Sequence, residues 1–312
     1  MTSFAFVFPG QGSQSVGMLD AWGDHPAVRE ILAEASTALS EDVARLIHQG
    51  PKEALDLTTN TQPVMLVAGL ACYRAWRHEG GAEPAAMAGH SLGEYTALVA
   101  AGALTLADAL PLVRFRAQAM QEAVPVGVGA MAAILGLDAR AVVDGCVEAA
   151  VASGEVVEAV NFNDPKQTVI AGSKAGVDKG CEVLKAMGAK RVLLLSVSAP
   201  FHSSLMKPAA DRLRAKLASV VITPPRLPLV NNIDVAVVSD AAAIRDALVR
   251  QAFGAVRWVE VVQALRLRGV SHIVECGPGK VLAGMVKRID SEAVAAALFD
   301  PTSLADVQGL LA

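Results

Sequence analysis

The segment Gly89 to Tyr95, which reads Gly-His-Ser-Leu-Gly-Glu-Tyr, places a serine in surroundings typical of an enzyme nucleophile. Residues 84–87 before it are apolar and bounded by turn residues, which predicts a short buried strand. Residues 94–101 after it are rich in alanine and leucine, which predicts a helix. Strand, Gly-x-Ser-x-Gly and helix are the parts of a nucleophile elbow, whose sharp turn exposes the serine hydroxyl. The sequence therefore predicts Ser91 as a nucleophile.

Ser91 needs a base, because a serine hydroxyl is a poor nucleophile until a neighbouring group takes its proton. Histidine is the usual base, and the chain contains six. His202 follows Pro200 in a predicted loop between domains, where catalytic side chains tend to lie. His272 is expected at the start of a strand, where a structural role is more common. We therefore expect His202 to be the base.

The group that orients His202 stays open in the sequence. Three acidic residues after Ser91 lie in predicted loops, namely Asp164, Asp234 and Glu275, and nothing selects one of them. A backbone or amide carbonyl could hold the imidazole equally well.

A predicted oxyanion hole needs two hydrogen-bond donors aimed at the developing negative charge. The N–H group of Leu92, directly after the nucleophile, is the expected first donor. Residues 4–8 form a predicted strand that ends in a glycine-rich loop, and this loop could bring the N–H group of Gln11 to the same place. The loop does not have dinucleotide-binding spacing, because Ser15 stands where a third glycine would be required.

A helix predicted from Thr105 to about Ala123 carries two arginines, Arg114 and Arg116. Residues two apart on a helix point about 200° apart, so only one of them can face a pocket. Helical spacing alone leaves open which arginine that is.

Predicted strands and helices alternate along most of the chain, which indicates an α/β fold with a mainly parallel sheet covered on both faces. Between residues 129 and 197 the predicted order is βαββαβ, which is typical of a ferredoxin-like unit. We expect residues 1–127 and 198–312 to form a catalytic domain and residues 128–197 to form an inserted subdomain. The last predicted element is a helix over residues 280–289, and Thr59 to Thr61 are expected to cap a buried helix over residues 62–76.

The composition excludes several classes of protein. The 312 residues carry a net charge of −4, which does not favour binding to nucleic acid through bulk charge. The long apolar run from Tyr95 to Val113 is interrupted by glycine, proline and aspartate, which favours two buried helices over a membrane span. The amino terminus lacks the basic region of a signal peptide, and the four cysteines are widely separated. These features predict a cytoplasmic protein without a disulfide framework or a zinc site.

Six motifs in order make the chain resemble the malonyl-CoA:acyl carrier protein transacylases of dissociated fatty acid synthesis, over essentially its whole length. The motifs are Phe8 to Gln14, Gly89 to Tyr95, Asn161 to Pro165, His202 to Met206, Asn231-Asn232 and Gly277 to Leu282. The resemblance implies an α/β-hydrolase-like core with an inserted ferredoxin-like subdomain.

The resemblance also implies roles for individual residues. Ser91 would be the acylated nucleophile and His202 its base, oriented by a main-chain carbonyl near Gln251, while Gln11 and Leu92 would form the oxyanion hole. Arg116 matches the family arginine because residues 116–121 repeat an Arg-x-x-x-Met-Gln pattern. Further substrate-binding candidates are Phe201, which resembles the malonyl-type signature, and Gln62, Met120, Asn161 and Asn163. Asp164 departs from the family, whose members often carry serine there.

The function implied is transfer of malonyl from coenzyme A to the phosphopantetheine thiol of acyl carrier protein, by ping-pong chemistry without a metal or redox cofactor. The alternatives are a serine hydrolase or thioesterase of the same fold and a non-catalytic module that docks a carrier protein. Fatty acid and polyketide synthesis both remain open as the pathway. Carrier proteins are typically acidic, so we expect local basic pairs to attract them, and the candidates are Lys190-Arg191 and Lys287-Arg288.

Overall fold

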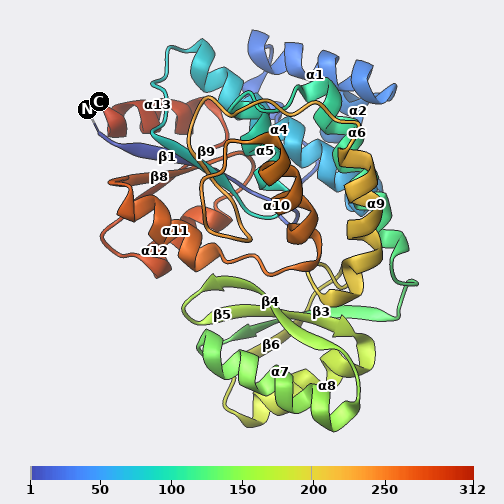
Figure 1. Cartoon of the computed structure of the whole chain (residues 1–312). Helices are drawn as coiled ribbons and strands as arrows, with labels where there is room; N and C mark the ends of the chain where they lie inside the picture. Colours follow the sequence, from blue (N-terminus) through green and yellow to red (C-terminus); the bar gives the residue numbers. More distant parts are fainter. Residues whose placement is uncertain (1, 198) are drawn as a thin grey trace.

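A computed structural model describes residues 2–197 and 199–312 of the chain. Met1 and Ser198, which begin the two segments of the predicted catalytic domain, lie outside the described residues. A large part contains a five-stranded sheet, and a smaller part with a four-stranded sheet packs below it (Figure 1). The division of the protein into two sheets fits the predicted inserted subdomain. The boundaries of that subdomain stay a prediction.

The five-stranded sheet is parallel in every strand pair, with the order β7-β2-β1-β8-β9. Its strands are β1 (Phe4–Phe8), β2 (Ala86–Gly89), β7 (Leu229–Val230), β8 (His272–Cys276) and β9 (Val294–Leu298). All five residues of β1 are buried, as expected for a central strand with helices on both faces. The predicted α/β fold with a mainly parallel sheet is therefore confirmed.

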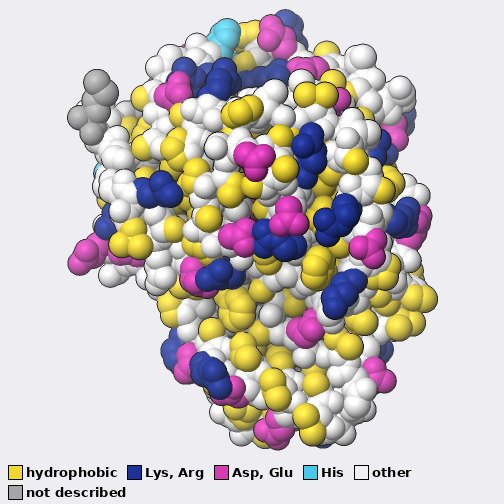
Figure 2. Space-filling model, in the orientation of Figure 1, with side chains coloured by type: hydrophobic (Ala, Val, Ile, Leu, Met, Phe, Trp, Pro, Cys, Tyr) yellow, Lys and Arg dark blue, Asp and Glu magenta, His cyan; other side chains and the backbone are white. Residues whose placement is uncertain are grey.

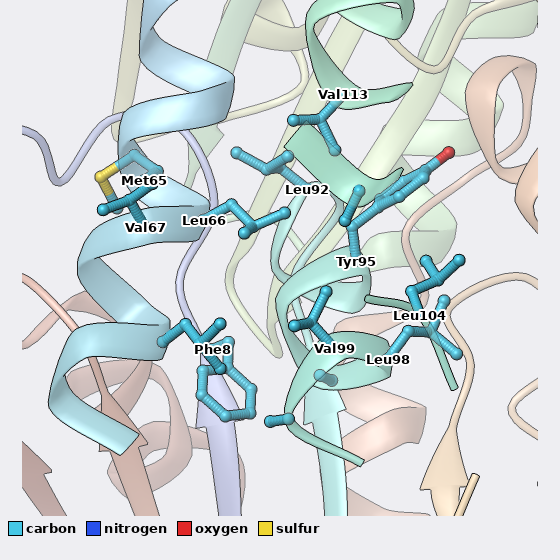
Figure 3. Packing of buried hydrophobic residues seen from close by; sticks show 14 of the residues in the cluster. Phe8, Met65, Leu66, Val67, Leu92, Tyr95, Leu98, Val99, Leu104 and Val113 are labelled. Atoms are coloured by element: carbon cyan, nitrogen blue, oxygen red, sulfur yellow. The ribbon is translucent and has the colours of Figure 1, made fainter. Parts of the chain in front are cut away.

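Side chains of β1 alternate between two separate apolar clusters. Phe4, Phe6 and Phe8 join the larger cluster, in which the rings of Phe6 and Trp76 lie edge to face with centroids 5.6 Å apart. Val7 points to the other face and joins the smaller cluster. The larger cluster is covered by α1 (Pro26–Leu39), α4 (Thr58–His78), α5 (Gly93–Ala100) and α6 (Leu106–Glu122), and the smaller by α11 (Trp258–Leu267) and α12 (Val281–Ile289). Phe8 lies between α4 and α5 (Figure 3).

The remaining helices of the large part connect these layers or lie at their edges. They are η1 (Asp20–Trp22), α2 (Val43–Gln49), α3 (Lys52–Leu55), η2 (Ser204–Met206), α9 (Lys207–Leu217), α10 (Ala241–Phe253) and α13 (Pro301–Leu311). Among the residues that the structure describes, no helix has both the length and the apolar character needed to cross a membrane. The apolar run from Tyr95 to Val113 is divided into α5 and α6, and the Thr105 side chain caps the second helix as predicted.

The smaller sheet is antiparallel, with the order β4-β5-β3-β6. Its elements are β3 (Gly129–Leu135), α7 (Ala139–Ser153), β4 (Val157–Asp164), β5 (Gln167–Ser173), α8 (Lys174–Ala186) and β6 (Arg191–Leu194). Both helices cover the face that points away from the large part (Figure 1). This order and chain direction match the predicted ferredoxin-like unit. Main-chain hydrogen bonds from Phe162 to Val256 and from Val256 to Val160 join β4 to the large part.

Several expected element boundaries were wrong. β9 and α13 follow the last predicted helix, and the Val-Ala-Ala-Ala-Leu sequence of β9 gave no strand signal because alanine is a poor strand former. Pairing with β8 overrides that preference. Helix α4 begins at Thr58 rather than after the expected caps, and its N-cap is Leu57. Strand β4 extends through Asp164, and the 3₁₀ turn η2 directly precedes α9.

Candidate active site

Ser91 lies in a sharp turn between β2 and α5, with a φ angle of 52° in the left-handed region. Two glycines are required here because neighbouring backbone passes too close for a side chain. A Cβ atom on Gly89 would lie 1.9 Å from the carbonyl carbon of Gly93, and one on Gly93 would lie 2.0 Å from the carbonyl oxygen of Phe8. The turn therefore has the strained, close-packed geometry of a nucleophile elbow.

Two buried amide side chains hold the main chain of Ser91 in this conformation. The Oδ1 atom of Asn232 accepts the Ser91 N–H at 2.7 Å, and its Nδ2 donates to the carbonyl of Gly89 at 2.7 Å. The Nε2 atom of Gln251 donates to the carbonyl of Ser91 at 3.1 Å. These bonds compensate for a backbone conformation that serine rarely adopts.

His202 lies within hydrogen-bond distance of the nucleophile. Its Nε2 is 2.7 Å from the Oγ of Ser91, and its Nδ1 is 2.8 Å from the main-chain carbonyl oxygen of Gln251. Because a carbonyl can only accept, Nδ1 carries the proton and Nε2 is free to accept one. Burial, followed by the charge of Arg116, lowers the pKa of His202 to about 3. The imidazole is therefore neutral at physiological pH, which is the form a general base requires.

The three acidic residues considered as partners of His202 all have other contacts. Asp164 pairs with Arg288, and Asp234 pairs with Arg250. Glu275 accepts the N–H of Ala283 at the start of α12. The orienting group is the carbonyl oxygen of Gln251, so the arrangement is a Ser–His pair rather than a triad with a carboxylate.

Arg116 is the arginine that faces the nucleophile, and it is only 2% exposed. Its Nη1 donates to the Oε1 of Gln62 at 2.8 Å, while its Nη2 lies 3.1 Å from the Oε1 of Gln251 and 3.2 Å from the Oγ of Ser91. The guanidinium carbon also lies 5.3 Å from the centroid of the Tyr95 ring. All of these partners are uncharged.

Within the described residues, no carboxylate forms an ion pair with Arg116. A buried cation without a counter-ion is costly, and burial accordingly lowers the pKa of Arg116. Arg114, two residues away, instead donates two hydrogen bonds to the Glu41 carboxylate near the surface, at 2.7 and 2.8 Å. Helical geometry thus separates the two arginines as expected, and the site offers its free charge to an anionic ligand.

A cavity of about 120 Å³ opens directly onto Ser91. Its lining includes eight other residues expected from the sequence to act in catalysis or binding: Gln11, Gln62, Leu92, Arg116, Met120, Asn161, Phe201 and His202. Met131, Leu195 and Val197 also line it, and sequence reasoning missed them. The cavity is small and largely apolar around one cation, so it suits a short acyl chain that ends in a carboxylate.

The two residues expected in the oxyanion hole both line this cavity. The loop that carries Gln11 packs against the elbow so closely that a Cβ atom on Gly10 would lie 2.7 Å from the carbonyl oxygen of His90. The side chain of Gln11 points to Thr58, with Nε2 3.4 Å from the hydroxyl oxygen. The placement of Gln11 and Leu92 beside Ser91 is compatible with an oxyanion hole. That role stays a prediction.

A wider groove of about 640 Å³ adjoins this cavity and shares Gln11, His90 and Asn161 with it. It runs between the glycine-rich loop of residues 9–14, the inner face of the small sheet and the start of α12. Asn163 lines this groove rather than the inner cavity, and its Oδ1 lies 2.9 Å from the Nε2 of His90. In the described part of the chain, no cluster of side chains has the makeup of a metal site.

Sequence reasoning missed the residues that support the site from behind, namely Glu94, Asn232 and Tyr95. Asn232 and Glu94 appear in the conspicuous motifs, but their contacts join segments more than 130 positions apart. The available signal was Glu94 itself, a charged residue at the start of an otherwise apolar helix.

Comparison with known proteins agrees with this geometry. A family model described as an acyl transferase domain matches residues 5–298. A malonyl CoA-acyl carrier protein transacylase of Escherichia coli (strain K12) is 53% identical over 306 residues, which cover 98% of each chain. A crystal structure of acyl-carrier-protein S-malonyltransferase from Burkholderia pseudomallei 1710b is 66% identical, covers 99% of this chain and 100% of its own, and superposes with a TM-score of 0.97.

A further solved structure holds a type II PKS acyl-carrier protein in complex with its malonyl-transacylase. The matched chain is 48% identical to this one, covers 99% of this chain and 100% of its own, and has a TM-score of 0.97. With a family model over most of its length and close relatives over nearly all of it, the chain belongs to the acyl transferase family, in the group of malonyl CoA-acyl carrier protein transacylases.

Proposed function

We propose that this protein transfers a malonyl group from coenzyme A to the phosphopantetheine thiol of acyl carrier protein, through a malonyl ester on Ser91. The observation that carries the proposal is that the hydroxyl of Ser91 lies within hydrogen-bond distance of both a base, His202, and a cation, Arg116. The Oγ of Ser91 lies 2.7 Å from the neutral His202 and 3.2 Å from the unpaired Arg116. The relatives described above have the same activity in their names.

In the first half-reaction, the Oγ of Ser91 attacks the thioester carbonyl while its proton passes to the Nε2 of His202. The tetrahedral oxyanion is stabilised by the N–H groups of Leu92 and Gln11. The carbon–sulfur bond then breaks, His202 returns the proton to the sulfur, and coenzyme A leaves as the free thiol. The second half-reaction reverses these steps with the carrier's thiol as nucleophile, so no oxidant, reductant or metal is consumed.

The role of Arg116 follows from the cost of burying a carboxylate. Malonyl differs from acetyl by a carboxylate that must leave water to enter the cavity. A guanidinium can hold that group with two parallel hydrogen bonds, which are stronger than bonds between neutral groups. Gln62 supports the guanidinium from behind. Phe201, Met120 and Asn161 line the remaining wall and limit the size of the acyl group.

The outer groove suits the long thiol-bearing arm that coenzyme A and the carrier share. Asn161 and Asn163 present amide groups along it, and the glycine-rich loop forms its opposite wall. A single channel for both substrates fits ping-pong chemistry, because one thiol must leave before the other enters.

Incubation with labelled malonyl-CoA and holo carrier protein tests this function against its two rivals. Stable transfer of label to the carrier is the expected result. Release of free malonate at a comparable rate would identify a serine hydrolase or thioesterase. Binding of the carrier with neither transfer nor release would identify a docking module. The unpaired Arg116 argues against a simple esterase, which has no need for a second carboxylate site.

Carrier docking should depend on local positive charge. Figure 2 shows lysine and arginine side chains interleaved with acidic ones on the face it presents, rather than gathered in one patch. Arg191 begins strand β6 and Lys190 directly precedes it, and residues 195–197 just after that strand line the groove. Lys287 lies on α12, whose first turns line the same groove, although Lys287 itself faces a separate hollow beside α13.

Arg288 is half-exposed, but its guanidinium already forms an ion pair. Its Nε donates to the Oδ2 of Asp164 at 2.6 Å, and that carboxylate is 4% exposed. Reversing the charge of Arg288 would leave a buried carboxylate without its ion-pair partner, so a loss of stability would obscure any effect on docking.

We expect the double change Lys190→Glu and Arg191→Glu to raise the KM for carrier protein about tenfold, because it weakens electrostatic attraction to an acidic partner. Lys287→Glu is expected to act in the same direction. Formation of the malonyl-serine ester from malonyl-CoA should be unchanged in both variants. Arg29→Glu, on α1 at the far end of the large part in Figure 1, is the matched control. Equal losses of loading and transfer would show that these residues do not serve docking.

A further inference from the structure

Glu94 is a buried carboxylate behind the nucleophile that neither half-reaction uses. It belongs to the first turn of α5 and is 2% exposed. Its Oε2 accepts the N–H of Asn232 at 2.9 Å and the Nε2 of Gln251 at 2.9 Å. One carboxylate oxygen thus joins two residues from separate segments, the loop after β7 and helix α10.

Both of these residues hold the main chain of Ser91 from opposite sides. Asn232 accepts the Ser91 N–H, and Gln251 donates to the Ser91 carbonyl. The Ser91 backbone has a φ angle of 52°, a conformation that serine rarely adopts. The carboxylate of Glu94 therefore forms a hydrogen bond with each of the two residues that hold the main chain of Ser91.

The same carboxylate also sets the direction of the Gln251 amide. An amide side chain has one donor end and one acceptor end. Because Glu94 takes the NH₂ end, the Oε1 end faces the guanidinium of Arg116 at 3.1 Å. The main chain of Gln251 in turn accepts the hydrogen bond from the Nδ1 of His202. Nucleophile, base and cation are thus linked through residues that Glu94 contacts directly.

We propose that Glu94 is a positioning residue for acyl transfer, whose carboxylate holds Asn232 and Gln251 so that Ser91, His202 and Arg116 keep their mutual geometry. The inference rests on the proposed function, because it concerns formation of the same serine ester. Glu94 does not touch the acyl group, and it acts only through the two amide residues.

The titration of Glu94 gives this role a measurable signature. Burial raises its pKa to about 7, although the hydrogen bonds from Asn232 and Gln251 and the charge of Arg116 on α6 oppose the shift. The other ionisable groups facing it are Asp234 in the loop after β7 and Tyr95 on α5. The carboxylate anion accepts stronger hydrogen bonds than the acid, so acylation of Ser91 should become faster as the pH rises through about 7. His202 does not contribute in this range, because its pKa is about 3.

Two variants separate the hydrogen bonds from the charge. Glu94→Leu removes the acceptor, and Glu94→Gln keeps an acceptor oxygen without the charge. The measurement is the rate of malonyl-serine formation by rapid quench and intact mass, over a range of malonyl-CoA concentrations and between about pH 6 and pH 8. Melting temperatures are recorded in parallel.

Glu94→Leu is expected to lower the maximal loading rate about 10²-fold while the KM for malonyl-CoA changes less than about threefold. Glu94→Gln should load at the rate that the unchanged protein shows at the acidic end of the range, and its rate should not vary with pH. Glu275→Gln is the matched control. It also removes a buried carboxylate whose pKa burial raises to about 7, but Glu275 bonds to the start of α12 in the groove wall and has no hydrogen bond to Ser91, Asn232 or Gln251.

Each outcome decides a specific question. Absence of the adduct in the unchanged protein would overturn the proposed function itself. A normal adduct whose rate of formation is independent of pH in the unchanged protein would overturn the role of Glu94 alone. Loading by a folded Glu94→Leu within about threefold of normal would do the same. Should Glu94→Leu fail to fold, the pH profile of Glu94→Gln decides, and a profile that still rises through pH 7 would contradict the inference.

Discussion

Ser91→Ala is expected to abolish the covalent malonyl adduct, which intact-mass analysis after exposure to malonyl-CoA should detect once per chain of the unchanged protein. The physical reason is that the hydroxyl at the elbow is held against a neutral imidazole, at 2.7 Å. Peptide mapping should place the adduct on the segment that contains Ser91. An adduct of equal size that persists in Ser91→Ala would disprove the assignment.

His202→Ala tests the other half of the pair. Loss of a positioned general base usually lowers the rate by about 10²–10⁴-fold. We expect a loss in this range for both loading and transfer, because the imidazole takes and returns a proton in each half-reaction. The melting temperature should show that the variant remains folded. A variant that loads at the normal rate would mean that another group accepts the serine proton.

Arg116→Ala is expected to lower malonyl transfer by about 10²-fold or more, since two charge-assisted hydrogen bonds are lost. Acetyl transfer should fall far less, because an acetyl group has no carboxylate for Arg116 to bind. The measurement is the ratio of kcat/KM for malonyl-CoA to that for acetyl-CoA. Arg116→Lys should restore only part of the malonyl rate, because lysine supplies the charge without the planar fork.

Arg114→Ala is the matched control for this prediction. Arg114 lies on the same helix, but it pairs with Glu41 near the surface, so its removal should cost little stability and no selectivity. Equal losses for both acyl groups in Arg116→Ala would indicate that Arg116 serves only to maintain the fold. A selective malonyl loss in Arg114→Ala would show that the wrong face of the helix had been chosen.

Local patterns predicted the parts of the site that depend on local geometry. The elbow follows from glycine spacing between a strand and a helix, and both glycines are required because an added Cβ atom would lie 1.9 or 2.0 Å from a backbone atom. His202 could be chosen because a loop position favours catalytic side chains. The choice between Arg114 and Arg116 could not be made from helical periodicity, which separates the two residues without saying where the cavity lies.

Contacts between distant segments could not be predicted from local patterns. Asp164 has no local feature that reveals its partner Arg288, because the two residues are 124 positions apart and meet only when the small sheet packs on α12. Asn232 and Glu94 are similar cases, since each reaches Ser91 or its supports across more than 130 positions. Strand β9 was missed for a related reason, because its alanines form a strand only through pairing with β8.

The hydrogen bonds of Arg116 go to uncharged side chains, and this has a consequence for folding thermodynamics. Folding removes this cation from water, and the carboxylate of Glu94 acts on it only across Gln251 rather than as an ion-pair partner, so burial of Arg116 lowers the free energy of unfolding. Arg116→Met should therefore melt at a higher temperature than the unchanged protein, although it cannot hold malonyl. Free malonate should raise the melting temperature of the unchanged protein, by mass action on the folded state, and leave that of Arg116→Met unmoved. Arg116 thus makes the folded protein most stable when substrate is bound. The free protein loses some stability at this side chain, and the same side chain provides the binding of the substrate.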